Sequence, residues 1–301
     1  MHLSLGTAQF GSKYGITNIH GIPSEQDIYY MLDMFFKAGH SFLDTAQEYG
    51  DAHEKISKWY KKHSLTLKIK ANITTKVYIR NKSDINSFKY NIESICEDLG
   101  LDNLYGVLIH NPSSLIDLED CYYLNEQFKV LKKSTIVKSI GVSVYTPQEL
   151  LNIYDKIPEI NLIQCPANIL DHRFLQPEIQ SFCMKRNIEI HARSLFLQGL
   201  LLSASIPEKL MINKDINNMI ENYKKFLKEN NLTAIEACCL FAYQNRDKMA
   251  RWVVGFNLPM ELEEFMLQTN KITRQFKVSF DMFAKKKNYI DPRTWSYEKI
   301  C

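Results

Sequence analysis

The sequence predicts one (β/α)8 barrel, of the TIM-barrel type, spanning residues 1–301. Short apolar segments alternate with longer amphipathic segments eight times along the chain. No linker rich in proline, glycine and serine divides them. The rival fold, a doubly wound sheet, normally carries a G-x-G-x-x-G turn after its first strand, and this chain lacks that turn. The residues from about 275 to 301 exceed the eight units, and we expect them to form a C-terminal helical extension over one barrel end.

The first half of the chain supplies four strands and the helices between them. Ser24 caps a helix that ends at Gly39, a second helix covers roughly 52–62, and a third opens at Ser83 and closes at Gly100. The segment 65–70 alternates apolar and polar residues with period two, as a strand does. The expected strands are residues 3–5, 41–44, 65–70 and 104–109.

The second half repeats this scheme. Thr146 and Glu149 form a capping box with Pro147 at the first helical position, and Thr233 with Glu236 forms another. The expected strands are residues 139–142, 160–164, 188–192 and 252–255.

Composition excludes several classes of protein. The net charge is +3, and no basic stripe is interleaved with aromatic residues, so we expect no nucleic-acid partner. The seven cysteines include no CxxC pair, which favours a reducing compartment over a disulfide framework. The N-terminus lacks the features of a signal peptide, and no apolar run approaches the ~18 residues of a membrane span. We therefore expect a soluble cytoplasmic protein without a membrane partner.

Polar residues stand at the expected ends of separate strands. Asp44 and Tyr49 follow the second strand, and His110 ends the fourth. Because the carboxyl ends of barrel strands converge on one rim, these groups can share one site. An acid, a phenol, a lysine and a histidine together suit hydride delivery to a carbonyl coupled to proton transfer. The histidines show no metal-ligand spacing, and we expect no metal.

Two lysines compete for the position beside Asp44. Period-two alternation in 65–70 turns Lys70 into the barrel, nearest the rim, where Asp44 is its natural partner. Lys76 is the alternative, and it requires the strand to slide by about six residues. Lys70 is therefore the expected lysine. Its ammonium would lower the pKa of Tyr49 from the usual ~10.

Four segments carry a resemblance to a known family. They are Leu5–Gly11 (LGTAQFG), Asp44–Ala46 with Tyr49–Gly50, Ile109–His110 and Ile140–Ser143. In this order, within a match from about residue 3 to 262, they resemble the signature segments of the aldo-keto reductase superfamily. The resemblance implies an NAD(P)H-dependent carbonyl reductase on a TIM barrel. It implies Tyr49 as general acid, Lys70 and Asp44 as the groups that tune it, and His110 as the group that orients the carbonyl.

The resemblance also implies a dinucleotide lying across the C-terminal face of the barrel. Arg193 stands where many members place an aromatic residue that stacks on nicotinamide, so it either stacks there or binds an anion of the substrate. NADPH is expected on family grounds, with NADH as the alternative, because the segment around Gly255 lacks the usual basic residue. The expected cofactor residues are Gly6, Thr7, Asp44, Ser143, Gln164, Arg193, Ser194, Leu195, Gly255 and Asn257.

The rim segments bear on the substrate. Tyr14 and Asn168 belong to segments that resemble bacterial reductases associated with surface polysaccharide and deoxysugar synthesis, which implies a keto-sugar or sugar-derived aldehyde. Asp171 and Arg173 either bind substrate or form a surface pair. Two rival functions stay open: a cofactor-binding regulatory protein with negligible turnover, and a lyase that forms a Schiff base through Lys70. We expect a monomer or a dimer.

Overall fold

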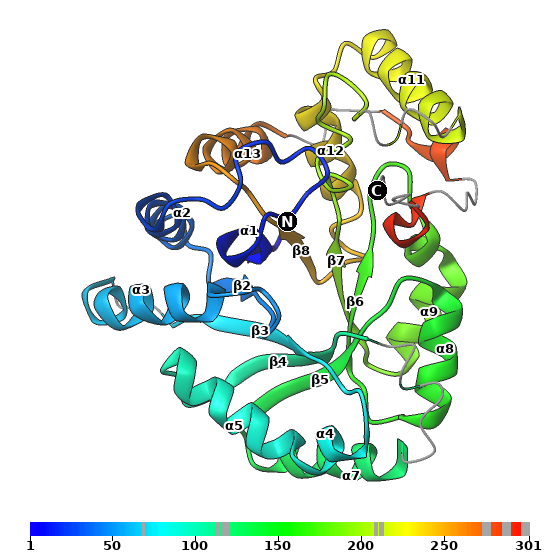
Figure 1. The fold of residues 1–301 in the computed structure, drawn as a ribbon. Helices are drawn as coiled ribbons and strands as arrows, with labels where there is room; N and C mark the ends of the chain where they lie inside the picture. The colour runs from blue at the N-terminus through cyan, green and yellow to red at the C-terminus, as the bar shows by residue number, and fades with distance from the viewer. Residues whose placement is uncertain are drawn as a thin grey trace, which may run out of the picture.

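Eight parallel strands form a closed barrel in the computed structural model, as the sequence predicts (Figure 1). The structure describes residues 1–67, 70–111, 115, 121–207, 210, 214–272, 278–284 and 290–295. Each strand pairs with the next, and β8 closes on β1 with Leu3 opposite Trp252. The strands are β1 (Leu3–Gly6), β2 (Phe42–Asp44), β3 (Asn72–Val77), β4 (Leu104–Ile109), β5 (Val137–Ser143), β6 (Leu162–Pro166), β7 (Glu189–Arg193) and β8 (Arg251–Val254).

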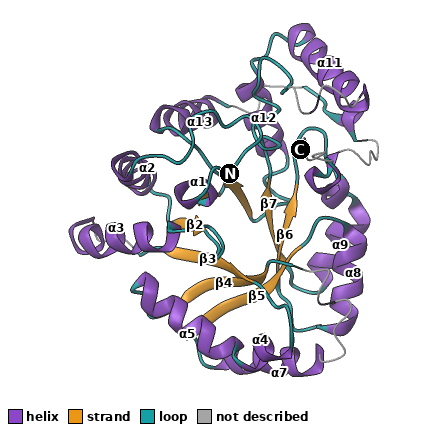
Figure 2. Cartoon of the chain, in the orientation of Figure 1, coloured by secondary structure: helices purple, strands orange, loops and turns teal. Residues whose placement is uncertain are grey.

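Helices surround the barrel (Figure 2). The Ser24 side chain accepts a hydrogen bond from the Asp27 backbone N–H, and both expected capping boxes are present, at Thr146 and at Thr233. The helices are α1 (Ala8–Gly11), α2 (Glu25–Lys37), α3 (Ala52–Leu67), α4 (Lys82–Asn86), α5 (Phe88–Leu99), α7 (Cys121–Lys133), α8 (Pro147–Lys156), α9 (Pro177–Lys185), α11 (Lys214–Glu229), α12 (Ala234–Gln244) and α13 (Pro259–Lys271), with 3₁₀ turns η1 (Arg173–Leu175), η2 (Asp281–Phe283) and η4 (Pro292–Thr294).

The expected third strand is wrong in position. Helix α3 continues to Leu67, and β3 begins at Asn72, so the strand lies seven residues later than the alternation of 65–70 indicates. Its register is fixed by its neighbours, with Asp44 opposite Thr74 and Lys76 opposite Leu108. Pairing within the closed barrel therefore overrides a local pattern that suits a strand.

The described parts of the C-terminal extension pack against the outer helices. Phe280 and Phe283 contact Phe226 of α11, with ring centroids 5.5 and 5.2 Å apart, and Phe280 also contacts Phe241 of α12. Arg293 of η4 forms an ion pair with Glu149 of α8 at 3.0 Å. Gln275, where the extension is expected to begin, lies outside the described residues. Within the described residues, none of the helices combines the length and apolarity needed to cross a membrane.

Candidate active site

A buried polar cluster lies at the ends of β2, β3 and β6. The Lys76 ammonium donates to Asp44 Oδ1 at 2.5 Å and to the Thr45 carbonyl at 3.0 Å, and its Nζ lies 3.4 Å from Tyr49 Oη. The other Asp44 oxygen, Oδ2, accepts a hydrogen bond from Gln164 Nε2 at 2.6 Å. The carboxylate thus holds the ammonium beside the phenol.

Lys70 does not belong to this cluster. It lies exposed in the segment between α3 and β3, whereas the Lys76 side chain is 2% exposed. The prediction that Lys70 pairs with Asp44 is wrong, because the strand that carries the inward-facing lysine is Asn72–Val77. The exposed position of Lys70 also gives no support to a Schiff-base lyase that uses this residue, since such a lysine is normally desolvated.

Two glycines allow the loop that carries Tyr49 to approach α1. A Cβ atom on Gly11 would lie 1.8 Å from the Tyr49 carbonyl oxygen, and a Cβ on Gly50 would lie 2.3 Å from the Gly11 carbonyl oxygen. Gly50 also has φ of +53°, in the left-handed region that glycine tolerates best. The segments LGTAQFG and DTAQEYG therefore pack backbone against backbone, and this contact fixes the position of Tyr49.

His110 is a neutral imidazole beside the phenol. Its ring centroid lies 6.0 Å from that of Tyr49 and 5.0 Å from that of Tyr78. Burial lowers the His110 pKa to about 3, and the positive charges of Lys76 and Arg193 act in the same direction. At neutral pH the ring therefore carries one N–H that it can donate to a ligand.

The pKa of Tyr49 is raised, contrary to the sequence expectation. Burial is the main cause and the Asp44 charge the next, while the Arg193 charge opposes them. Burial lowers the pKa of Lys76, and Asp44 opposes that shift. Asp44 lies beside both Tyr49 and Lys76. Its negative charge raises the pKa of Tyr49 and so offsets the lowering expected from the Lys76 ammonium. Tyr49 is thus a protonated phenol at neutral pH, as a proton donor must be.

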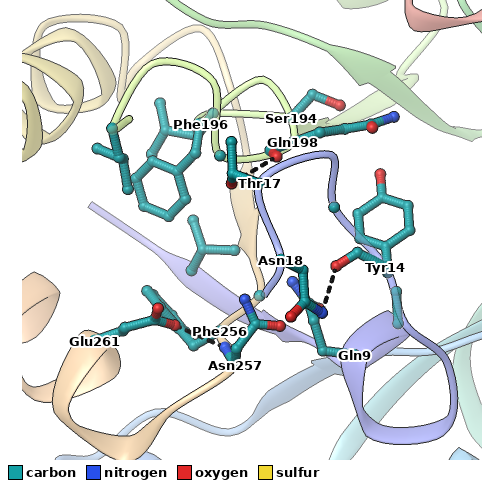
Figure 3. A pocket seen from close by; sticks show the side chains of 18 of the residues that line it. Gln9, Tyr14, Thr17, Asn18, Ser194, Phe196, Gln198, Phe256, Asn257 and Glu261 are labelled. Atoms are coloured by element: carbon teal, nitrogen blue, oxygen red, sulfur yellow. Dashed lines mark hydrogen bonds between the residues drawn. The ribbon is translucent and has the colours of Figure 1, made fainter. Parts of the chain in front are cut away.

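A cavity of about 540 Å³ opens beside this cluster at the carboxyl ends of the strands, a volume usual for small-molecule sites. Figure 3 shows Tyr14, Thr17 and Asn18 from the loop after β1 beside Ser194 and Gln198 from the loop after β7. Nine of the ten expected cofactor residues line this cavity: Gly6, Thr7, Asp44, Gln164, Arg193, Ser194, Leu195, Gly255 and Asn257. The tenth, Ser143, is buried in β5 opposite Gln164 and does not line it.

The two expected substrate residues differ in position. Tyr14 lines the cavity and is 40% exposed. Asn168 is fully buried; its amide donates to the Ser194 carbonyl at 3.1 Å, and its oxygen accepts from the Leu170 backbone N–H at 2.9 Å. The expectation that Asn168 contacts substrate is therefore wrong, because both ends of its side chain are used to hold the loop after β7.

Asp171 and Arg173, the other residues considered for substrate binding, form a structural ion pair. Arg173 Nη2 lies 2.6 Å from Asp171 Oδ2, and the Asp171 side chain is fully buried. The pair does not line the cavity, and it is not a surface turn pair either.

The cavity wall also includes residues that the sequence did not single out as site residues. Gln9, Phe196 and Gln198 line the cavity, and so does Asn18. The Asn18 amide donates to the Tyr14 and Gly21 carbonyls, and its oxygen accepts from the His20 and Gly21 backbone N–H groups. The run Tyr14–Asn18 stands out in the sequence, but its spacing alone does not reveal that Asn18 shapes the loop that presents Tyr14.

The cavity wall near β8 combines a close backbone approach with an unpartnered polar atom. Gly255 lets the Gln9 side chain approach the end of β8, since a Cβ atom at position 255 would lie 2.4 Å from Gln9 Oε1. Asn257 lines the cavity, and its buried Oδ1 has no partner among the described residues, which leaves an acceptor for a ligand. Within the same described part of the chain, no cluster of histidine, cysteine, aspartate and glutamate side chains is arranged to hold a metal ion.

A parallel barrel with a polar cavity at the carboxyl ends of its strands defines a TIM-barrel protein with a small-molecule site. The family model of the aldo/keto reductases matches residues 2–275, and the chain belongs to this family of oxidoreductases, whose members generally use NAD(P)H. No curated protein matches the sequence.

Solved structures agree with the family in fold. Aldo-keto reductase AKR11C1 from Bacillus halodurans, in its holo form, superposes with a TM-score of 0.73 at 17% identity, covering 94% of this chain and 92% of that one. PA4992, described as an aldo-keto reductase from Pseudomonas aeruginosa, gives a TM-score of 0.62 at 16% identity, covering 89% and 88% of the two chains.

Proposed function

We propose that this protein is an NAD(P)H-dependent reductase that converts an aldehyde or ketone to an alcohol. The observation that carries the proposal is the contact of Lys76 with both Asp44 and Tyr49 beside the cavity. Buried charges are costly unless they are paired, and perturbed titratable groups at a cleft are typical of functional sites. A reductase uses such a cluster, whereas a barrel without catalysis has no need of it.

The roles follow from the contacts. When bound, NAD(P)H supplies the hydride. Tyr49 donates its phenolic proton to the carbonyl oxygen, and Lys76, held by Asp44, stabilises the phenolate that forms. Neutral His110 donates a hydrogen bond to the same oxygen and orients the carbonyl. Gln164, fixed by Asp44, would hold the dinucleotide together with Ser194, Asn257 and the backbone of Leu195.

For the cofactor, the cavity wall favours NADH over the NADPH expected on family grounds. Arg193 is the single lysine or arginine among the described residues that line the cavity. Where the wall reaches α13 it contributes Glu261 and Glu264 instead, and Glu261 accepts hydrogen bonds from the backbone of Asn257 and Leu258. A 2′-phosphate binds best to cationic side chains, whereas a 2′-hydroxyl suits carboxylates. Fluorescence titration with each cofactor measures this preference.

For the substrate, we propose a keto-sugar or sugar-derived aldehyde that acts in carbohydrate biosynthesis in the cytoplasm. The wall offers hydroxyl and amide groups from Gln9, Tyr14 and Gln198, which suit the hydroxyl groups of a sugar.

The Tyr49→Phe variant tests the proposal. It removes one oxygen atom, so NAD(P)H binding should stay within about threefold of wild type, while kcat for 4-nitrobenzaldehyde should fall by at least ~100-fold, as expected for loss of a general acid. Tyr122→Phe makes the same change at an exposed site and should have no effect. Near-normal turnover by Tyr49→Phe would refute the mechanism. If the wild type binds NAD(P)H but reduces no carbonyl compound, the protein is a cofactor-binding homologue without this activity.

A further inference from the structure

Arg193 brings a positive charge into the cavity at the end of β7. Its guanidinium donates to Ser194 Oγ at 3.2 Å and to the Val144 carbonyl at 3.4 Å, and it lies 4.1 Å from the ring centroid of Tyr145. These contacts hold the group in one place on the cavity wall. These three partners are neutral.

Other partly buried arginines of this protein have carboxylate partners. Arg173 pairs with Asp171 at 2.6 Å, and Arg251 pairs with Glu189 at 4.0 Å. Within the described residues, no carboxylate forms an ion pair with Arg193. The nearby Asp44 has both oxygens engaged, one by Lys76 and one by Gln164. The charge of Arg193 is therefore uncompensated at the reactive end of the cavity.

The positive charge of Arg193 influences the pKa of two tyrosines at the cavity, Tyr14 and Tyr49. Desolvation in the cavity raises the Tyr14 pKa to about 12, and the Arg193 charge is the first influence that opposes it. At Tyr49, burial and Asp44 raise the pKa and Arg193 again opposes them. The Arg193 charge thus acts on both tyrosines that line the cavity.

A fixed, unpaired guanidinium in a cavity is a recognition element for an anion. It is costly to desolvate without a counter-charge, and its planar fork matches the two oxygens of a carboxylate or phosphate. From this geometry we infer that Arg193 binds an anionic group on the carbonyl substrate, so that the enzyme prefers aldehydes and ketones that carry a carboxylate or phosphate. This inference rests on the proposed reduction and names its substrate class.

Matched substrates test the inference. 4-Carboxybenzaldehyde and 4-carbamoylbenzaldehyde have nearly the same shape and differ in charge, and glyceraldehyde 3-phosphate with glyceraldehyde provides the phosphate comparison. In the wild type, kcat/KM should favour the anionic member of at least one pair, which also identifies the preferred anion. Arg193→Gln should reduce that preference by about 10- to 100-fold, the usual range for one hydrogen bond to a charged group. Arg186→Gln removes the same charge from an exposed helix end and should leave it unchanged.

Binding without turnover separates this inference from the proposed function. Calorimetric titration of the protein, saturated with the oxidised cofactor, should show benzoate binding more tightly than benzamide in the wild type and equally weakly in Arg193→Gln. An unchanged preference in Arg193→Gln would overturn the inference, and so would a tenfold loss of NAD(P)H affinity without a change in anion preference. If the wild type reduces none of the four aldehydes, the proposed reduction fails, while the benzoate titration still decides the role of Arg193.

Discussion

Replacement of Lys76 by methionine should destabilise the protein by about 3–5 kcal/mol and abolish carbonyl reduction. Methionine has nearly the volume of lysine, so the change removes the charge with little change in packing. Asp44, whose side chain is 4% exposed, would then be a buried carboxylate that retains one hydrogen bond, from Gln164. The quoted loss is the usual cost of removing one partner from a buried ion pair.

Two further variants separate charge from packing. In the double variant Lys76→Met/Asp44→Asn no charge stays buried, and the amide oxygen introduced at position 44 can still accept from Gln164, so most of the lost stability should return while activity stays absent. Lys70→Met changes an exposed lysine and should alter the free energy of unfolding by less than about 0.5 kcal/mol.

Urea unfolding followed by tryptophan fluorescence measures all three variants against the wild type, with aldehyde reduction measured in parallel. If Lys76→Met unfolds within about 0.5 kcal/mol of wild type, the ion pair does not hold the site as described. A loss of activity in Lys70→Met, with Lys76→Met active, would show that Lys70 is the functional lysine after all.

Two other predictions concern His110 and the loop that carries Tyr49. The folded pKa of His110, about 3, lies below the unfolded value of ~6.5, so the protein should lose stability as the pH falls from ~6.5 towards 3, by up to ~1.4 kcal/mol per pH unit. Urea unfolding of His110→Asn at several pH values should show a shallower loss. An identical pH profile in the variant would contradict the assigned pKa shift. Gly11→Ala should lower the unfolding free energy by at least ~1–3 kcal/mol and kcat/KM by about tenfold or more, since its Cβ would lie 1.8 Å from the Tyr49 carbonyl oxygen. Gly39→Ala is its control: the added Cβ meets no atom within 4 Å at φ of +87°, so it should cost ~1–2 kcal/mol of stability and leave turnover unchanged.

Local chemistry made much of the fold predictable. Helix starts at Ser24, Thr146 and Thr233 are visible in sequence because a capping hydrogen bond needs only the cap residue and its near neighbours. The strand over 104–109 is likewise apolar throughout and buried throughout. His110 directly follows this strand and lies beside Tyr49.

The third strand escaped prediction because its signal is not local. Residues 72–77 read NITTKV, and their polar side chains Asn72, Thr74 and Lys76 resemble a loop. On β3, Lys76 faces the barrel interior and reaches Asp44, while Thr75 on the other face contacts His53 of α3 at 3.3 Å. A polar residue becomes acceptable in a barrel only when another strand supplies its partner, and single-strand alternation does not contain that information.

The role of Asn168, on the rim of the barrel, could not be predicted for the same reason. An asparagine in a loop after a strand suits a ligand contact, but its two hydrogen bonds run to Leu170 nearby and to Ser194 on a distant loop. The sequence shows the hydrogen-bonding groups of Asn168 and their position along the chain. The partner of its amide, the Ser194 carbonyl, is set by the pairing of β6 with β7.

The bond between Gln164 and Asp44 joins residues 120 positions apart and links the first half of the barrel to the second. Closing a loop of that length is entropically costly, so we expect this contact to form late in folding, after the strands between the two residues have paired. A nascent chain that ends before β6 therefore has Tyr49, Lys76 and His110 but only half of the partners of Asp44. The hydrogen bonds of the polar cluster are therefore all formed only in a chain that has added β6 to its barrel.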